Sequence, residues 1–199
     1  MYVMKKDDGK TYVYVRNGRT YVSTLDIKGI SAITVYMPNG TLLTNASVTV
    51  DGLPMTTDGN GKVYMSGDKG KKVSLDIIHN ESYKTKVICV FGEDAEVHLE
   101  QLYLLTVTTT GFTYSDKFTI TTTVDGVSHT GSLLMYVEPN TSVTVKAVDT
   151  SGEYDYSYST YVKLDGTNTK KMNYTFTMDT SHDVTFTNGT SSYIGGGGT

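Results

Sequence analysis

The chain has 199 residues and a formal net charge of −4, with its lysines and arginines scattered along the sequence. Scattered positive charge does not support nucleic-acid binding, which needs a basic cluster. The single cysteine excludes an intrachain disulfide, and no apolar run approaches the roughly 20 residues that span a bilayer. Stability must therefore come from packing, and we expect neither nucleic acid nor a membrane as a partner.

The residue composition favours β-strands over helices. Tyrosine is frequent (16), proline is scarce (3), and threonine and valine dominate the periodic segments. The length leaves room for two small domains. We therefore predict an all-β chain with two tandem Ig-like or prealbumin-like β-sandwich domains at 27–101 and 102–190. A β-meander at 1–26 precedes them, and a Gly-rich tail at 191–199 follows.

The N-terminal segment has the pattern of a meander. Asn17-Gly18 between alternating apolar residues is a strong hairpin signal, and Tyr12 and Tyr14 project to one side of the strand before it. A small sheet of this kind is marginal on its own in water. It therefore either caps the first sandwich or docks onto another subunit. The predicted strands are 2–5, 11–16 and 20–24.

The first domain is organised around residues 40–65. Val48 and Val50 alternate with polar residues, which indicates a strand with one buried face. Asp58-Gly59-Asn60-Gly61 then supplies residues that tolerate the positive φ of tight turns, and it predicts a hairpin.

This stretch resembles the carboxypeptidase regulatory-like domains and the related Cna B-type domains, both prealbumin-like β-sandwiches. The resemblance covers about 28–101, and it implies a fold and a spacer or binding role without chemistry at the turn. Cna B-type domains often contain a Lys-to-Asn isopeptide bond. The matching last strand here, 95–100, has no Asn, so we predict no such bond. The residues that carry the likeness are Gly40, Ala46 to Val50, Thr57 to Gly61 and Lys62 to Met65.

The region from Glu93 to Leu105 has a composition that would also suit a helix. We predict a strand, because Ala95, Val97 and Leu99 alternate with polar residues.

The second domain consists of short predicted strands separated by turn residues such as Asp125-Gly126. Residues 139–147 and 174–186 resemble the small β-repeat domains of bacterial surface proteins. Those repeats often carry a tryptophan midway, where Tyr156 and Tyr158 stand here. The predicted strands are 104–110, 117–124, 131–137, 142–148, 157–164, 171–178 and 182–187.

No motif for catalysis or for a metal is present, so we expect no enzyme activity and no cofactor. The Asp58 turn begins like a calcium loop, but Lys69 stands where a bidentate Glu belongs; a looser calcium site at Asp51, Asp58 or Asn60 is an alternative. Cys89 lies in an apolar run and is predicted to be a buried hydrophobe. Four histidines lack metal-ligand spacing and are predicted to be exposed strand or loop residues: His79, His98, His129 and His182.

Tyrosines offer the best candidate binding surface, since they combine a large rigid area with a polar tip. Tyr154, Tyr156 and Tyr158 form a row on one face if their segment is extended, although that face could instead pack on the opposite sheet. The tail is either a flexible end or a segment that becomes ordered only against a partner. The candidate partner-binding residues are Tyr12, Tyr14, Tyr154, Tyr156, Tyr158, Tyr193 and Ile194.

These features predict a non-enzymatic structural protein. The first hypothesis is a component of a bacteriophage virion, such as a capsid decoration, collar, tail or fibre protein, made in the host cytoplasm because no signal peptide is visible. Its partners would be other virion proteins and further copies of itself. The alternative is a bacterial surface adhesin or filament subunit. The third hypothesis is a carbohydrate-binding module that recognises a host-surface glycan.

Overall fold

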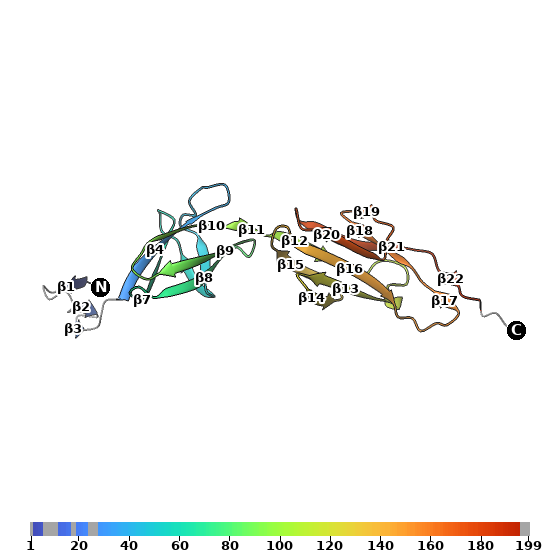
Figure 1. The fold of residues 1–199 in the computed structure, drawn as a ribbon, viewed down its shortest axis with the longest axis horizontal. Helices are drawn as coiled ribbons and strands as arrows, with labels where there is room; N and C mark the ends of the chain where they lie inside the picture. Colours follow the sequence, from blue (N-terminus) through green and yellow to red (C-terminus); the bar gives the residue numbers. More distant parts are fainter. Residues whose placement is uncertain (1, 6–11, 17–18, 24–27, 196–199) are drawn as a thin grey trace. The chain divides into compact units, whose positions relative to one another are not determined.

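The computed structural model describes residues 2–5, 12–16, 19–23 and 28–195 (Figure 1). The predicted all-β class is confirmed: the described residues form strands in several sheets, with a 3-10 turn at Ser115–Lys117. None of the helical structure in these residues is long and apolar enough to cross a membrane. The backbone divides into two compact units, residues 1–100 and 101–199.

The N-terminal strands form a sheet of their own. β1 (Tyr2–Lys5), β2 (Tyr12–Arg16) and β3 (Arg19–Ser23) pair antiparallel in this order. Arg16 lies opposite Arg19, as the hairpin signal between them predicts. Residues 17–18 themselves lie outside the described residues. No strand of either sandwich belongs to this sheet.

The rest of the first unit is a β-sandwich of two sheets, ordered β10-β4-β7 and β11-β9-β8-β5-β6. Val48 and Val50 are fully buried in its core, as their alternation predicts, and Cys89 is buried beside them. The strands are β4 (Lys28–Tyr36), β5 (Ser47–Val50), β6 (Leu53–Thr56), β7 (Lys62–Asp68), β8 (Lys72–His79), β9 (Tyr83–Val90), β10 (Ala95–His98) and β11 (Glu100–Gln101).

The turn after β6 is not the predicted hairpin. β6 pairs with β5 whereas β7 pairs with β4, so this turn crosses from one sheet to the other. The Asp58 carboxylate holds it by accepting the N–H groups of Asn60 (2.8 Å) and Lys62 (2.9 Å) and the hydroxyl of Tyr64 (3.0 Å). The Lys62 N–H is the largest cause of the lowered pKa of Asp58. Because both carboxylate oxygens already have protein donors, this geometry does not favour the calcium alternative.

The ambiguous region 93–105 is extended, as predicted. Val97 and Leu99 point into the core while Glu96, His98 and Glu100 are exposed. The strands β10, β11 and β12 (Tyr103–Val107) occupy this region.

The second unit is a β-sandwich with sheets ordered β15-β12-β21-β18-β19 and β14-β13-β16-β20. Leu105, Val143, Val162 and Met178 are fully buried between them. The further strands are β13 (Phe118–Val124), β14 (Val127–Thr130), β15 (Leu133–Val137), β16 (Ser142–Asp149), β18 (Thr160–Leu164), β19 (Thr167–Asn168), β20 (Asn173–Thr177) and β21 (His182–Asn188).

The strand β14 is not among the strands predicted from the sequence. Asp125 and Gly126 both have positive φ and connect β13 to β14, with Val124 opposite Val127. Val127 is 59% exposed, and the rest of β14 is polar. The strand therefore lacks the buried alternating face by which a strand is recognised in a sequence.

Each sandwich pairs an early strand with a late strand in parallel. β4 pairs with β10 in the first unit, and β12 pairs with β21 in the second. Since paired parallel strands run in the same direction, the chain enters each sandwich at one end and leaves it near the opposite end.

Candidate functional site

Four of the seven candidate residues gather at one end of the second unit. β17 (Tyr156–Ser157), in the connection from β16 to β18, pairs with β22 (Ser192–Tyr193), and both lie beyond the ends of the main sheets (Figure 1). Tyr154 is 96% exposed, and Tyr156, Tyr193 and Ile194 are 48%, 66% and 54% exposed. We call these four residues the tyrosine patch.

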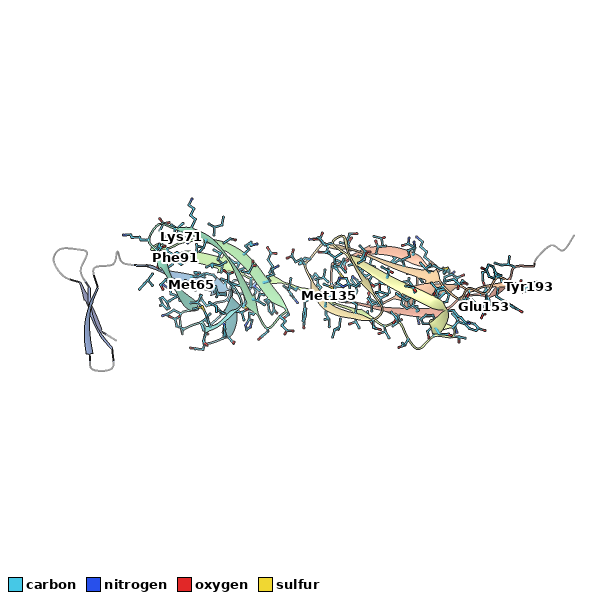
Figure 2. The ribbon with its side chains drawn as sticks, turned by 90° about the horizontal axis from the view of Figure 1, so that it is seen from below. Met65, Lys71, Phe91, Met135, Glu153 and Tyr193 are labelled. Carbon is cyan, nitrogen blue, oxygen red and sulfur yellow. The ribbon has the colours of Figure 1, made fainter. Side chains whose placement is uncertain are left out.

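Contacts between two distant segments hold the tyrosine patch together. The rings of Tyr156 and Tyr193 meet edge to face with centroids 5.5 Å apart. The N–H of Ile194 donates to the carbonyl of Asp155 (2.9 Å), and Figure 2 shows Tyr193 near Glu153 at this end of the unit. Residues 192–194 therefore pack against the loop that carries Tyr154 and Tyr156. Residues 196–199 lie outside the described part of the structure.

The predicted row of three tyrosines is wrong. Tyr154 lies in a turn instead of a strand, and Tyr158 is half-buried against the core of the second unit. The Tyr158 ring packs against Tyr114 with centroids 4.8 Å apart, and its hydroxyl donates to Glu153. Tyr158 therefore supports the loop from the side of the core, while Tyr154 and Tyr156 face solvent.

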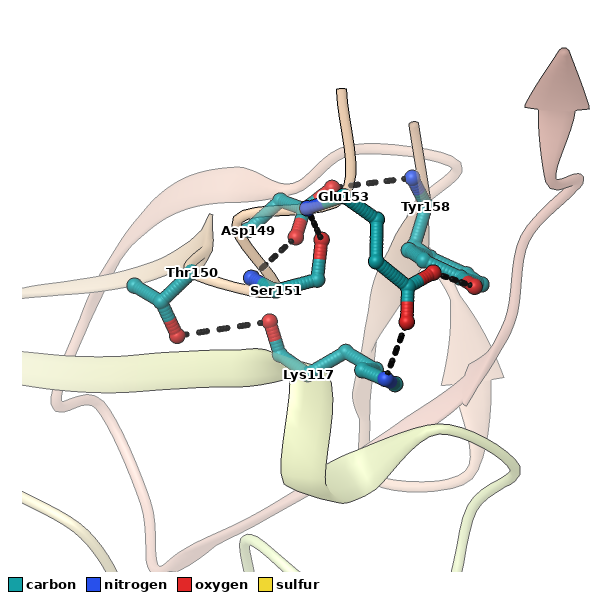
Figure 3. A network of polar contacts seen from close by, with 6 residues as sticks. All are labelled: Lys117, Asp149, Thr150, Ser151, Glu153 and Tyr158. Carbon is teal, nitrogen blue, oxygen red and sulfur yellow. Dashed lines mark hydrogen bonds and ion pairs between the residues drawn. The ribbon is translucent and has the colours of Figure 1, made fainter. Parts of the chain in front are cut away.

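The Asp149 side chain stabilises the loop that carries Tyr154 and Tyr156 (Figure 3). Its two carboxylate oxygens accept the backbone N–H groups of Ser151 and Tyr158, each at 2.9 Å. The N–H of Tyr158 is the largest cause of the lowered pKa of Asp149. The Asp149 carboxylate therefore ties the start of the loop to its end.

Glu153 ties the loop to the 3-10 turn that precedes β13. Its carboxylate accepts a hydrogen bond from the Lys117 ammonium (2.7 Å) and another from the Tyr158 hydroxyl. The Lys117 hydrogen bond lowers the pKa of Glu153, and the same bond raises the pKa of Lys117. The hydrogen bond to Glu153 also raises the pKa of Tyr158. All three groups therefore keep their ordinary charge states near neutral pH, and the loop presents its exposed tyrosines from a fixed base.

Replacing Asp149 with alanine should release the loop. Two backbone N–H groups lose a charged acceptor in a partly exposed position, so we expect the second unit to lose about 1–2 kcal/mol. Hydrogen exchange measured by mass spectrometry should accelerate over 150–158 and 192–194. Asp183→Ala, which removes an exposed carboxylate on β21, should leave both regions unchanged. Equal exchange in the two variants would contradict the role of Asp149.

A second polar cluster surrounds His182. This residue was predicted to be exposed, but it is buried. Its side chain is 8% exposed, and its ring nitrogens lie 2.7 Å from an Asp165 oxygen and 3.0 Å from an Asp179 oxygen. His182 is in phase with the buried residues Val184 and Phe186 on β21, and this alternation was the signal that could have identified it. Burial lowers the pKa of His182, but the hydrogen bonds to the two carboxylates outweigh this effect, so the net shift is upward.

This geometry predicts a pH dependence for the second unit. The pKa of His182 is raised in the folded state. Its contribution to the free energy of unfolding is therefore fully present below the unfolded pKa of about 6.5, and it is lost as the pH rises through the folded pKa. The midpoint of thermal unfolding should therefore fall as the pH rises above about 6.5. His182→Gln should reduce this fall. An undiminished fall in the variant would assign the pH dependence to other groups.

Two of the candidate residues belong to the N-terminal sheet. Tyr12 and Tyr14 lie on β2, whose side chains are outside the described part. In the described residues, no group of three or more His, Cys, Asp or Glu side chains is placed to hold a metal. Among the described residues, the buried polar or charged side chains include no lysine. They are Ser31, Thr34, Thr57, Thr122, Thr160 and His182.

A shallow hollow of about 310 Å³ adjoins the tyrosine patch. Both carboxylates in it are already hydrogen-bonded within the loop, and no nucleophile in the lining is paired with a base. The arrangement is therefore suited to contact. Its lining residues are Asp149, Ser151, Gly152, Glu153, Tyr154, Tyr156, Ser157 and Ile194.

Comparison with known proteins identifies no family. No family model and no curated protein matches the chain. Among solved structures, the chain is similar to the Bacillus anthracis TIE protein, with 12% identity and a TM-score of 0.28 over 89% of this chain and 41% of that one. It is also similar to a Streptococcal ancillary pilin, with 9% identity and a TM-score of 0.30 over 89% of this chain and 75% of that one. The chain thus spans about two fifths of the length of the first protein.

Proposed function

We propose that the chain is a non-enzymatic structural module of an extracellular assembly, exposed on a bacterial surface, and that it acts through protein contacts made by the tyrosine patch. The observation that carries this proposal is the patch itself. Four large side chains, each at least 48% exposed, gather where residues 192–194 meet a loop that Asp149, Glu153 and Lys117 hold in place. Exposed apolar groups gathered on a rigid base mark interaction sites.

The course of the chain through the two sandwiches supports the structural part of the proposal. Because the chain enters each sandwich at one end and leaves near the other, each unit adds length between the segments that precede and follow it. Such modules suit a spacer that presents a contact surface, as the resemblance to Cna B-type domains also implies. A spacer of this kind would also suit a virion. The experiment below therefore also determines where the protein is located in its native source.

Photo-crosslinking in the native source tests this function. A photoreactive phenylalanine at Tyr154 should form adducts with a protein neighbour, because Tyr154 is almost fully exposed. The same probe at Val127, which is 59% exposed on β14, should form few. Protease treatment of intact cells, with mass spectrometry of purified phage particles beside it, distinguishes the cell surface from a virion. Absence of adducts at Tyr154 in either location would refute the contact role.

A further inference from the structure

The strand β15 forms an apolar edge of the second unit. It lies at the end of its sheet, where β12 is its partner, and its residues Leu133-Leu134-Met135-Tyr136-Val137 carry no charge. Leu134 is 69% exposed and Tyr136 is 38% exposed. An exposed apolar edge strand is a template for pairing with another strand.

The backbone groups of β15 divide between its two sides. Next to it, the N–H of Thr108 at the end of β12 donates toward β21 (2.9 Å). Since backbone groups alternate between the two sides of a strand, Leu105 presents its groups to β15, where it lies opposite Met135. Leu134 and Tyr136 therefore direct their N–H and C=O groups away from β12. No other strand among the described residues pairs with that side of β15.

The other outer strands of the two sandwiches have features that discourage such pairing. β7 and β10 carry charged residues, β6 contains Pro54, and β14 and β20 have polar residues at most positions. β11 and β19 are two residues long. Charge, proline and short length are the usual protections of an exposed edge. β15 has none of these protections, so it is the edge most open to an added strand.

A second copy of β15 fits this edge in both hydrogen bonding and charge. When two copies pair antiparallel with Met135 opposite Met135, Leu134 of each copy lies beside Tyr136 of the other. These residues then exchange backbone hydrogen bonds and form two aliphatic–aromatic cross-strand pairs. Glu138, the first charged residue after the strand, lies opposite the uncharged Ser132 of the other copy. A parallel arrangement would instead place the two Glu138 residues side by side, where like charges destabilise the pair.

We propose that two copies of this chain pair through β15 in this antiparallel register. The contact is isologous, because each copy contributes the same surface, so it closes as a two-fold dimer. The two five-stranded sheets then become one continuous sheet. Because the paired strands are short, we expect a weak dimer with a Kd between about 10 μM and about 1 mM. The inference goes beyond the proposed function, since this edge is separate from the tyrosine patch.

Engineered cysteines in the full chain test the pairing and its register. Met135, labelled in Figure 2, lies opposite its own copy, with Cα atoms about 4.5 Å apart in a pair of this kind. Met135→Cys should therefore form a disulfide-linked dimer under mild oxidation, which doubles the mass on a non-reducing gel. Leu134→Cys or Tyr136→Cys alone should remain largely monomeric, whereas a mixture of these two variants should crosslink. The wild type is the control, because Cys89 is fully buried.

Charged variants test the same contact by sedimentation velocity. Leu134→Lys with Tyr136→Lys places like charges opposite each other across the dimer, so association should weaken at least about tenfold. The corresponding double glutamate variant should weaken it similarly. A mixture of the lysine and glutamate variants should recover the dimer, because each lysine then faces a glutamate.

A matched control separates this contact from general effects of charge. Ile88→Lys with Val148→Lys adds the same charge at two exposed apolar positions outside β15, and their exposed fractions of 69% and 39% match those of Leu134 and Tyr136. This variant should associate like the wild type.

Several results would overturn the proposal. A wild type that stays monomeric up to about 1 mM, or a Met135→Cys variant that gives no linked dimer, would show that β15 does not pair with itself. A lysine variant that associates as strongly as its control would place the contact on another surface. A mixture of the lysine and glutamate variants that stays monomeric would contradict the register. Adducts at Tyr154 in the native source do not depend on β15, so the proposed function would stand if this dimer failed.

Discussion

Replacing Leu105 with alanine is expected to lower the free energy of unfolding of the second unit by about 2–5 kcal/mol. Leu105 is fully buried on β12, a strand flanked by β15 and β21 in its sheet. Removing its side chain loses buried apolar contact and leaves a cavity that the two packed sheets can fill only in part. Denaturant titration followed by circular dichroism, with hydrogen exchange to localise the change, measures this loss.

The position of the loss tests whether the two cores are separate. The buried cluster around Leu105 shares no residue with the cluster around Ile33 in the first unit. Exchange rates in 28–100 should therefore stay unchanged in the variant. Leu134→Ala is the matched control, because Leu134 lies on the neighbouring β15 and is 69% exposed. A loss at Leu134 as large as that at Leu105 would contradict the assigned faces of this sheet.

Replacing Gly29 with alanine should destabilise the first unit by about 1–3 kcal/mol or more. An added Cβ would lie 2.5 Å from the backbone nitrogen of Gly92 and 2.6 Å from the carbonyl oxygen of Phe91. The neighbouring contacts fix this close approach, because the Ser31 hydroxyl donates to Val90 O and accepts from the Gly92 N–H, each at 3.0 Å. Backbone on both sides must therefore move to admit the methyl group.

Gly59 supplies the control for this prediction. No heavy atom lies within 4 Å of a Cβ built there, and its φ is not positive. Gly59→Ala should therefore be neutral or should stabilise by about 0.4–1 kcal/mol, because alanine restricts the unfolded chain. A thermal midpoint for Gly29→Ala as high as that for Gly59→Ala would show that β4 does not pack against residues 91–92 in this way. Figure 2 labels Phe91 at this end of the first unit.

Local patterns were sufficient to predict most strands but not which sheet each strand joins. The alternation of Val48 and Val50 correctly indicated a buried face. The turn at 58–61 has the composition of a hairpin, yet it joins strands of different sheets. Sheet membership depends on pairing with β4 and β5, which are distant in sequence, so turn chemistry alone cannot settle it.

The residues of the candidate site could be predicted from the sequence, but the way in which they come together could not. Tyrosine content singled out Tyr154, Tyr156 and Tyr193, but the pairing of β17 with β22 joins positions 35 and 37 residues apart in the sequence. His182 was misjudged for a related reason. Its partner Asp165 lies in the turn from β18 to β19 and Asp179 in the connection from β20 to β21, and only the folded chain places them around one ring.

The parallel pairs β4–β10 and β12–β21 have a consequence for a protein that bears mechanical load. Tension on the two ends of a sandwich pulls its paired early and late strands in opposite directions along their length. The hydrogen bonds between them are then sheared together, whereas strands pulled apart from one edge would lose their bonds one after another. Both sandwiches are thus arranged to resist extension at the strands where the force enters.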